Sequence, residues 1–198
     1  MTQIHVLAHS LTSVASDVLK ALPYGRTDVV LTNVNYHDDA EMKRIVERKK
    51  AEYRYGTHFH TTPHGLSDFL INFEPPRRTS DEHTSVVIDN LNLFASNMML
   101  LYNSEYVSLP AIREAIFREL GTLVNQRAQL GFDSLTILTS EVDHDYTVRT
   151  HLGRLYQQLL YDVNAFVARF LADSYGILTH GTSIPLTLPT RTHTRTTA

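Results

Sequence analysis

Short runs of apolar and β-branched residues recur along the chain and predict five strands. Each run is bounded by polar or turn-forming residues, and none is long enough to cover its own apolar surface. The strands must therefore pair with one another and pack against other elements. They are predicted at residues 4–8, 28–32, 85–89, 135–139 and 175–179.

Between these runs, apolar residues recur every three or four positions, which is the period of an amphipathic helix. The first such pattern covers residues 37–53 and begins with two aspartates that are candidate N-caps. The others cover 109–130, where Pro110 suits a first-turn position, and 148–172. Strands that alternate with helices predict an α/β protein, in which helices cover both faces of a mostly parallel sheet.

The alternation of predicted strands and helices continues through residue 186, so we predict one domain over residues 1–186. The segment 187–198 is rich in threonine and arginine. It has too little apolar surface to offset the entropy lost when a chain is ordered. We therefore expect a disordered tail over residues 187–198.

The composition narrows the class of protein. The chain has 198 residues, of which 42% are hydrophobic and 20% are charged, enough for one substantial core. Its formal net charge of −3 argues against a general nucleic-acid binder, which carries an excess of basic residues. The absence of cysteine excludes disulfides, thiolate metal sites and cysteine nucleophiles. No apolar run reaches the roughly 20 residues of a membrane span, so we expect a cytoplasmic protein.

The N-terminal segment 4–22 has the layout of a phosphate-binding loop: an apolar strand, a tight loop and an amphipathic helix. Its loop, residues 9–16, has the sequence HSLTSVAS and contains neither glycine nor lysine. A phosphate loop needs backbone conformations that glycine tolerates and that Val14 resists by about 1–2 kcal/mol. It also needs a lysine to face the phosphates.

The segment 86–101 contains an apolar strand that ends in Asp89. The end of a parallel strand lies at the carboxyl edge of the sheet, where α/β proteins bind ligands. In phosphate-loop enzymes an aspartate at this place helps to hold Mg²⁺ against the nucleotide phosphates. The alternative is a structural aspartate that caps a helix or closes a turn.

Four segments carry a further pattern when they are taken together. They are DDAEMKRI at 38–45, DNLNLFASN at 89–97, SEV at 140–142, and the stretch 156–186. In sequence and spacing they resemble segments of the adenosylcobinamide kinase / adenosylcobinamide-phosphate guanylyltransferase family, which assembles the nucleotide loop of cobalamin. The matching residues are Asp39, Glu41, Met42, Arg44, Ile45, Asp89, Leu91, Leu93, Asn97, Glu141, Val142, Asn164, Ala172, Asp173, Gly181 and Leu186.

This resemblance implies a P-loop NTPase-like, RecA-like fold that assembles as a homotrimer. It also implies two activities: phosphorylation of adenosylcobinamide, and then attachment of GMP through a guanylylated histidine. Both would use Mg²⁺ with ATP or GTP. On the same grounds, Ser13, Ser16, Asp89 and Glu141 are the remnants of a nucleotide site.

The positions that carry chemistry in that family are replaced in this chain. The guanylylated histidine falls on Arg48, whose guanidinium stays protonated and cannot act as a nucleophile. The three glycines and the lysine of the family loop fall on His9, Ser10, Val14 and Ala15. Catalysis by either route is therefore not expected.

A second way of counting along the helix moves the histidine position to Lys49. Its amine must lose a proton before it can attack. The surrounding run KRIVERKK, residues 43–50, is typical of a solvated helix face, with an anion site as the alternative.

The only histidines near this position are His58, His60 and His64. They are candidates for a replacement nucleophile or for a bound transition metal, since His60 and His64 have a spacing that suits one helix face. The alternative is a polar loop that leads into a helix at Leu66 and leaves the histidines partly exposed.

Three hypotheses follow, and we favour the first. It is a diverged pseudoenzyme that keeps the fold and the trimer and binds at most a nucleotide, a corrinoid or a protein partner. The second is an active cobalamin-biosynthesis enzyme with relocated catalytic residues. The third is a binder of a metal or small ligand through the histidine loop.

Overall fold

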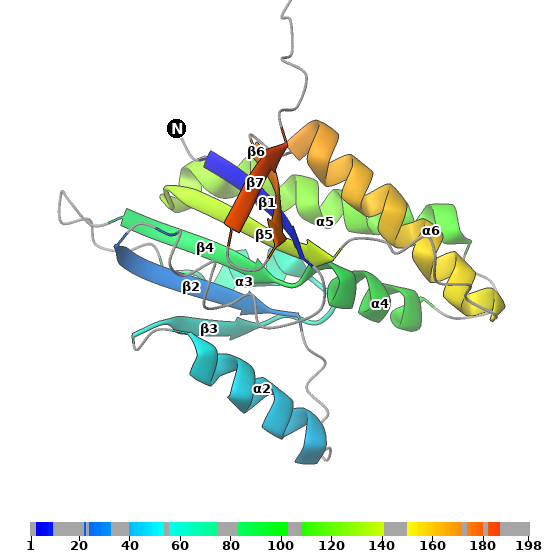
Figure 1. The fold of residues 1–198 in the computed structure, drawn as a ribbon, viewed down its shortest axis with the longest axis horizontal. Coiled ribbons are helices and arrows are strands. Elements are labelled where there is room, and N and C mark those ends of the chain that lie inside the picture. Colours follow the sequence, from blue (N-terminus) through cyan, green and yellow to red (C-terminus); the bar gives the residue numbers. More distant parts are fainter. Residues whose placement is uncertain are drawn as a thin grey trace, which may run out of the picture.

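The computed structural model describes residues 3–9, 22, 24–32, 40–53, 56–74, 83–102, 108–140, 150–171, 174–179 and 182–186. Within these residues, seven strands form one sheet in the order β3-β2-β4-β5-β1-β6-β7 (Figure 1). All neighbouring strands are parallel except β6 and β7, which pair antiparallel at one edge. The strands are β1 Gln3–His9, β2 Gly25–Leu31, β3 His58–Thr61, β4 His83–Asp89, β5 Ser134–Ser140, β6 Ser174–Thr179 and β7 Thr182–Leu186.

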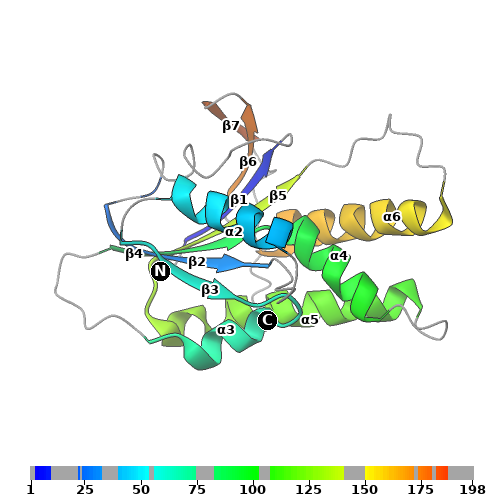
Figure 2. The same cartoon turned by 90° about the horizontal axis from the view of Figure 1, so that it is seen from below.

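Helices cover both faces of this sheet, as the sequence predicts. Figure 2 shows α2 on one side of the sheet and α3 and α5 on the other. The helices are α2 Ala40–Glu52, α3 Leu66–Asn72, α4 Leu91–Leu101, α5 Leu109–Leu130 and α6 His151–Phe166, which continues as the π-helix η1 Val167–Leu171.

Two apolar clusters lie on opposite faces because successive side chains of a strand point to opposite sides. In β2, Val30 belongs to the larger cluster with α3, α4, α5 and α6. Val29 and Leu31 belong to the smaller one, where Val46 of α2 packs. Buried side chains on both faces explain why the strands are nearly continuous apolar runs.

All five predicted strands are confirmed, and each begins earlier than predicted, β2 by three residues, β4 by two and the others by one. β2 and β4 pair from Gly25 opposite His83 to Leu31 opposite Asp89. Gly25 has a φ of 154°, and a Cβ there would lie 2.0 Å from the carbonyl oxygen of His83. The two strands therefore approach so closely at this end that only glycine fits.

The predicted polar loop before Leu66 is wrong over residues 58–61, which form the edge strand β3. This strand runs parallel to β2, with His60 opposite Val30. Its sequence, HFHT, has Phe59 as its single apolar residue, so a search for apolar runs passes over it. β7, at the other edge, is likewise absent from the predicted strands.

The predicted helices that fall on described residues agree with the structure within a few residues, and the helix predicted after the loop 9–16 lies outside the described residues. α5 has the predicted bounds; it has Pro110 in its first turn and is followed by Gly131 with a φ of 74°, a left-handed C-cap. α2 begins at Ala40 in the described chain, and its candidate N-caps, Asp38 and Asp39, lie outside the described residues.

The long apolar stripe predicted at 148–172 divides into a buried middle and exposed ends. Leu159, Val163 and Val167 are buried in the larger cluster. Leu152 and Phe170 are 46% and 63% exposed, so an interface between subunits stays a prediction for these ends. Within the described residues, no helix has both the length and the hydropathy needed to traverse a bilayer.

Candidate functional site

The carboxyl ends of the central parallel strands meet at one edge of the sheet, here called the carboxyl edge. β4 ends at Asp89, next to Leu31 at the end of β2, and β1 ends at His9 beside Ser140 of β5. The loop predicted to face phosphate starts at this edge. Its residues Ser13 and Ser16 lie outside the described part of the chain, as does Glu141.

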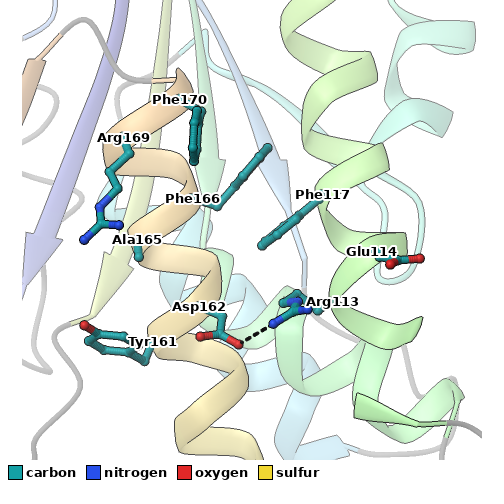
Figure 3. Close-up of a pocket in the computed structure, with 9 residues that line it drawn as sticks. All are labelled: Arg113, Glu114, Phe117, Tyr161, Asp162, Ala165, Phe166, Arg169 and Phe170. Carbon is teal, nitrogen blue, oxygen red and sulfur yellow. Dashed lines mark hydrogen bonds and ion pairs between the residues drawn. The ribbon is translucent and has the colours of Figure 1, made fainter. Parts of the chain in front are cut away.

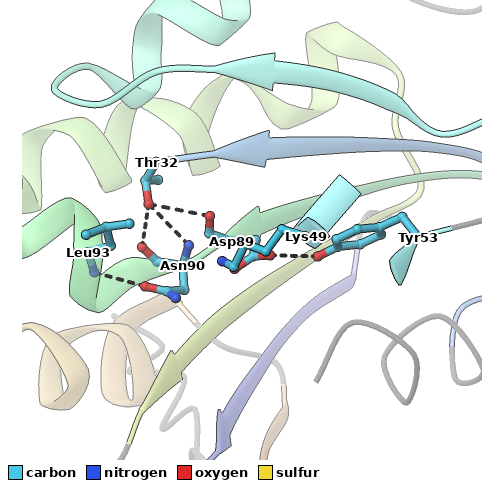
Figure 4. A network of polar contacts seen from close by, with 6 residues as sticks. All are labelled: Thr32, Lys49, Tyr53, Asp89, Asn90 and Leu93. Carbon is cyan, nitrogen blue, oxygen red and sulfur yellow. Dashed lines mark hydrogen bonds and ion pairs between the residues drawn. The ribbon is translucent and has the colours of Figure 1, made fainter. Parts of the chain in front are cut away.

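Asp89 is 5% exposed. One of its carboxylate oxygens contacts a side chain of α2, and the other contacts Tyr53, the residue directly after that helix. The ammonium nitrogen Nζ of Lys49 lies 2.5 Å from Oδ1. The hydroxyl of Tyr53, a buried residue, donates to Oδ2 at 3.0 Å (Figure 4). These contacts hold the C-terminal end of α2 against the carboxyl end of β4.

Of the two residues aligned with the family histidine, only one reaches the carboxyl edge. Arg48 is exposed on α2. Lys49 contacts Asp89, because adjacent residues on a helix point in directions about 100° apart. The predicted solvated face of 43–50 is thus wrong for Lys49, while Lys43, Arg44 and Arg48 are exposed as predicted.

The residue that caps α4 is Asn90 and not Asp89. The structural alternative in which the aspartate caps a helix is therefore wrong. Asn90 Oδ1 accepts from the backbone N–H of Leu93 at 2.9 Å. The hydroxyl of Thr32 donates to the carbonyl oxygen of Asn90 at 2.8 Å, and the Asn90 N–H donates to that hydroxyl oxygen at 3.2 Å. These bonds join the ends of β2 and β4 (Figure 4).

Two asparagines that match the family pattern hold backbone carbonyls at the carboxyl edge. Asn97 Nδ2 donates to the carbonyl oxygens of Thr32 at 2.6 Å and Pro63 at 3.2 Å. Asn164 Nδ2 donates to the carbonyl oxygen of Ser140 at 3.0 Å. Both side chains therefore have a structural role, because they hold the backbone at the ends of β2 and β5.

The three histidine candidates do not converge. His60 Nε2 lies 2.9 Å from Asp28 Oδ1, while His58 and His64 are exposed. His60 lies in a strand and His64 in the bend that follows, so the helical spacing that motivated the metal hypothesis does not apply. Among the described residues, no group of three histidine, aspartate or glutamate side chains could hold a metal ion.

Asp28 forms a buried charged cluster that the sequence prediction missed. It is 0% exposed and accepts from Arg26 Nε at 2.7 Å and Nη2 at 3.0 Å, in addition to its contact with His60. Burial disfavours the charged carboxylate, but the hydrogen bonds from His60 and Arg26 and the Arg26 charge outweigh it. The pKa of Asp28 consequently lies below its usual 3.8. The available signal was Arg26-x-Asp28, which places both side chains on one face of a strand.

This lowered pKa predicts an acid-dependent loss of stability. The unfolded chain binds a proton at Asp28 at a pH where the folded protein does not, so the stabilisation is complete above the unfolded pKa of 3.8 and is lost as the pH falls through the folded value. Urea denaturation from about pH 6 to about pH 2 should show a steeper fall for the wild type than for Asp28→Asn. A parallel decline of both proteins would contradict this assignment.

One buried hydroxyl near the carboxyl edge has no hydrogen-bond partner in the described part of the chain. Thr62, which follows β3, is 8% exposed, and its Oγ1 has no hydrogen bond within the described residues. An unpaired buried hydroxyl costs about 1–3 kcal/mol. Thr62→Val keeps the shape and the backbone bond to the Leu31 carbonyl, so it should raise the free energy of unfolding by about 1 kcal/mol in urea denaturation. The exposed neighbour Thr61→Val should change it by less than about 0.5 kcal/mol; a destabilised Thr62→Val protein would refute the prediction.

A pocket of about 430 Å³ lies between α5 and the end of α6 (Figure 3). The rings of Phe117 and Phe166 stack with centroids 4.0 Å apart, and the exposed Phe170 lies 5.5 Å from Phe166. Arg113 Nη1 and Asp162 Oδ2 form an ion pair at 3.2 Å along its wall. The pocket therefore has an aromatic lining and an accessible apolar rim.

The arrangement of strands defines the class of protein. β5 lies between β1 and β4, and β6 lies on the other side of β1. These strands are parallel, helices cover both faces, and an aspartate ends β4 at the carboxyl edge. The protein is therefore an α/β protein whose strand order and helix layers are those of a RecA-like fold.

Comparison with known proteins adds no closer identification. No family model matches the chain, and no curated protein matches it in sequence. Among solved structures, one described as an ATPase domain is 14% identical with a TM-score of 0.44, over 89% of this chain and 69% of that one. An ATPase from the type III secretion system of pathogenic bacteria is 12% identical with a TM-score of 0.47, over 90% of this chain and 51% of that one.

Proposed function

We propose that this protein is a diverged relative of the adenosylcobinamide kinase / adenosylcobinamide-phosphate guanylyltransferase family that has lost catalysis. It keeps a P-loop-type scaffold and binds at most a nucleotide, a corrinoid or a protein partner. The observation that supports this most strongly is the ion pair of Lys49 with Asp89. This pair joins Lys49, the candidate nucleophile of the guanylylation, to Asp89, the carboxylate expected to hold Mg²⁺ in the phosphoryl transfer.

The first reaction, phosphoryl transfer, depends almost wholly on positioning and electrostatic stabilisation. The loop 9–16 has neither the glycines that let a backbone wrap a phosphate nor the lysine that faces it. Removing one preorganised donor costs about 100–1,000-fold in rate in another enzyme class. Loss of the whole set leaves no route to an efficient kinase.

The second reaction, guanylylation, requires a nucleophile with a free lone pair. Arg48 is exposed and permanently cationic. Lys49 is the cationic partner of Asp89, and an ammonium group has three donors and no lone pair to attack with. His60, the best placed of the nearby histidines, is engaged by Asp28.

A covalent-labelling experiment tests this proposal. The protein is incubated with Mg²⁺ and GTP labelled in the α-phosphate, then denatured and separated from free nucleotide. We expect no retained label. Label that is retained by the wild type and lost in Lys49→Ala would instead support an active enzyme with a relocated nucleophile.

We also propose that the chain forms a homotrimer. Support comes from the exposed aromatic rim of the pocket between α5 and α6 and from further exposed apolar residues on α4 and α6, since such patches commonly mark interfaces. Solution mass measured by light scattering should be three times the 22.5 kDa of the chain. A solution mass equal to that of one chain would contradict the proposed homotrimer. The exposed residues are Leu100, Leu101, Leu152, Tyr161 and Phe170.

A further inference from the structure

Asp89 stands where the fold class places a ligand of Mg²⁺. Magnesium takes oxygen ligands at about 2.0–2.1 Å in near-octahedral geometry and keeps several waters around it. It therefore needs an accessible carboxylate oxygen with open space beyond it. Whether Asp89 offers such an oxygen can be judged from its contacts.

The contacts of Asp89 do not fit a divalent cation. Oδ1 has the Lys49 ammonium at 2.5 Å, and Oδ2 accepts from the Tyr53 hydroxyl at 3.0 Å. The side chains of Lys49 and Asp89 are only 25% and 7% exposed, so water screens the pair weakly. A metal on Oδ1 would share that oxygen with a full positive charge, and a metal on Oδ2 would displace the tyrosine.

Among the described residues near the end of α2, no other cation is placed in the same way. Arg48 is exposed, and Lys50 Nζ pairs with Glu47 Oε1 at 3.0 Å and lies over the ring of Phe59. These neighbouring side chains thus contact solvent, their own helix or the ring of Phe59 in β3. Among the described cationic side chains of α2, Lys49 is the one paired with the carboxyl edge.

We infer that Lys49 is the resident cation of the carboxyl edge: its ammonium takes the place of a divalent metal at Asp89. Asp89 consequently serves the fold by anchoring α2 to β4, and it does not coordinate Mg²⁺. This inference rests on the proposed loss of catalysis and deepens it, because it gives a structural reason why metal-assisted phosphoryl transfer is absent.

Paramagnetic Mn²⁺ tests the inference directly, without nucleotide. In the wild type, titration to millimolar Mn²⁺ should leave the amide NMR signals of Thr32 and Asn90 unbroadened. The Mn²⁺ affinity measured by electron paramagnetic resonance should be the same in the wild type and in Asp89→Asn. Selective broadening at Thr32 and Asn90, or weaker Mn²⁺ binding in Asp89→Asn, would overturn the inference.

Variants of Lys49 supply the gain-of-binding test. Lys49→Met removes the charge but keeps an apolar stem, so Asp89 should then bind Mn²⁺ about tenfold to 1,000-fold more tightly. Lys49→Arg keeps a cation and should gain nothing, and Lys50→Met on the same helix should also gain nothing. A folded Lys49→Met protein, as judged by circular dichroism, that gains no Mn²⁺ binding would contradict the inference. If Lys49→Met does not fold, the inference is judged by whether Mn²⁺ broadens the amide signals of Thr32 and Asn90 in the wild type.

The two proposals can fail separately. Retained guanylyl label with no Mn²⁺ at Asp89 would reject the loss of catalysis but leave the resident cation in place. Mn²⁺ bound at Asp89 without any label or turnover would reject the resident cation and leave the loss of catalysis standing.

Discussion

Replacing Asp28 with asparagine is expected to lower the free energy of unfolding by about 3–5 kcal/mol, the typical result of removing one partner from a buried charge pair. The substitution keeps the size of the side chain but leaves the guanidinium of Arg26 without its counter-charge. The amide also loses the charge-assisted bond to His60. Urea denaturation followed by circular dichroism measures the change.

The matched control is the same substitution at a more exposed ion pair. Asp162→Asn breaks the pair with Arg113, in which the aspartate and arginine side chains are 21% and 38% exposed. Such pairs contribute about 0–1 kcal/mol, so this variant should be nearly as stable as the wild type. An Asp28→Asn protein with a loss as small as that of the control would show that the buried charged cluster does not stabilise the fold in this way.

Phe94→Ala is the second large effect, with an expected loss of about 3–5 kcal/mol. Phe94 is 0% exposed in the larger apolar cluster, and it lies on α4 one turn after the Asn90 cap. Removing its ring leaves a cavity against the sheet just behind the carboxyl edge, where the backbone is fixed by hydrogen bonds and relaxes little. Thermal and urea unfolding both report the change.

Ser96→Ala on the same helix provides the comparison. Ser96 is partly exposed and loses only a hydroxyl, so this substitution should change the free energy of unfolding by no more than about 0.5 kcal/mol. Equal changes in the free energy of unfolding for the two substitutions would mean that Phe94 does not hold α4 against the core. The outcome matters for the site because α4 starts immediately after Asp89 and Asn90.

The fold could be predicted wherever local pattern and tertiary packing agree. α5 carries an apolar stripe, a proline near its start and a glycine after its end, and its bounds match the prediction. The strand that ends in Asp89 is a buried apolar run and was equally predictable. β3 was missed because an edge strand needs little apolar surface, and HFHT has one apolar residue.

The site was predicted only in part, because its contacts join segments that are distant in sequence. Asp89 could be placed at the carboxyl edge from its position after an apolar strand. Its pairing with Lys49 could not, since 40 residues separate the two and the run KRIVERKK is like any solvated helix face. The Asp28 cluster was missed for the same reason: His60 reaches Asp28 only after β3 docks beside β2.

The residues that match the family pattern and those that depart from it have different roles. Asn97 and Asn164 hold backbone carbonyls, and Asp89 anchors α2 through Lys49. The departures fall on the loop at 9–16 and on Arg48, the positions that would touch phosphate or carry the covalent intermediate. A scaffold kept by its structural residues while its reactive ones are replaced is what loss of catalysis predicts.

The most direct measurement of that claim is transfer of the γ-phosphate of ATP or GTP to adenosylcobinamide in the presence of Mg²⁺. We predict no phosphorylated product above the uncatalysed background, even at high protein concentration and long incubation. Time-dependent product that scales with protein concentration and disappears in Asp89→Asn would contradict it.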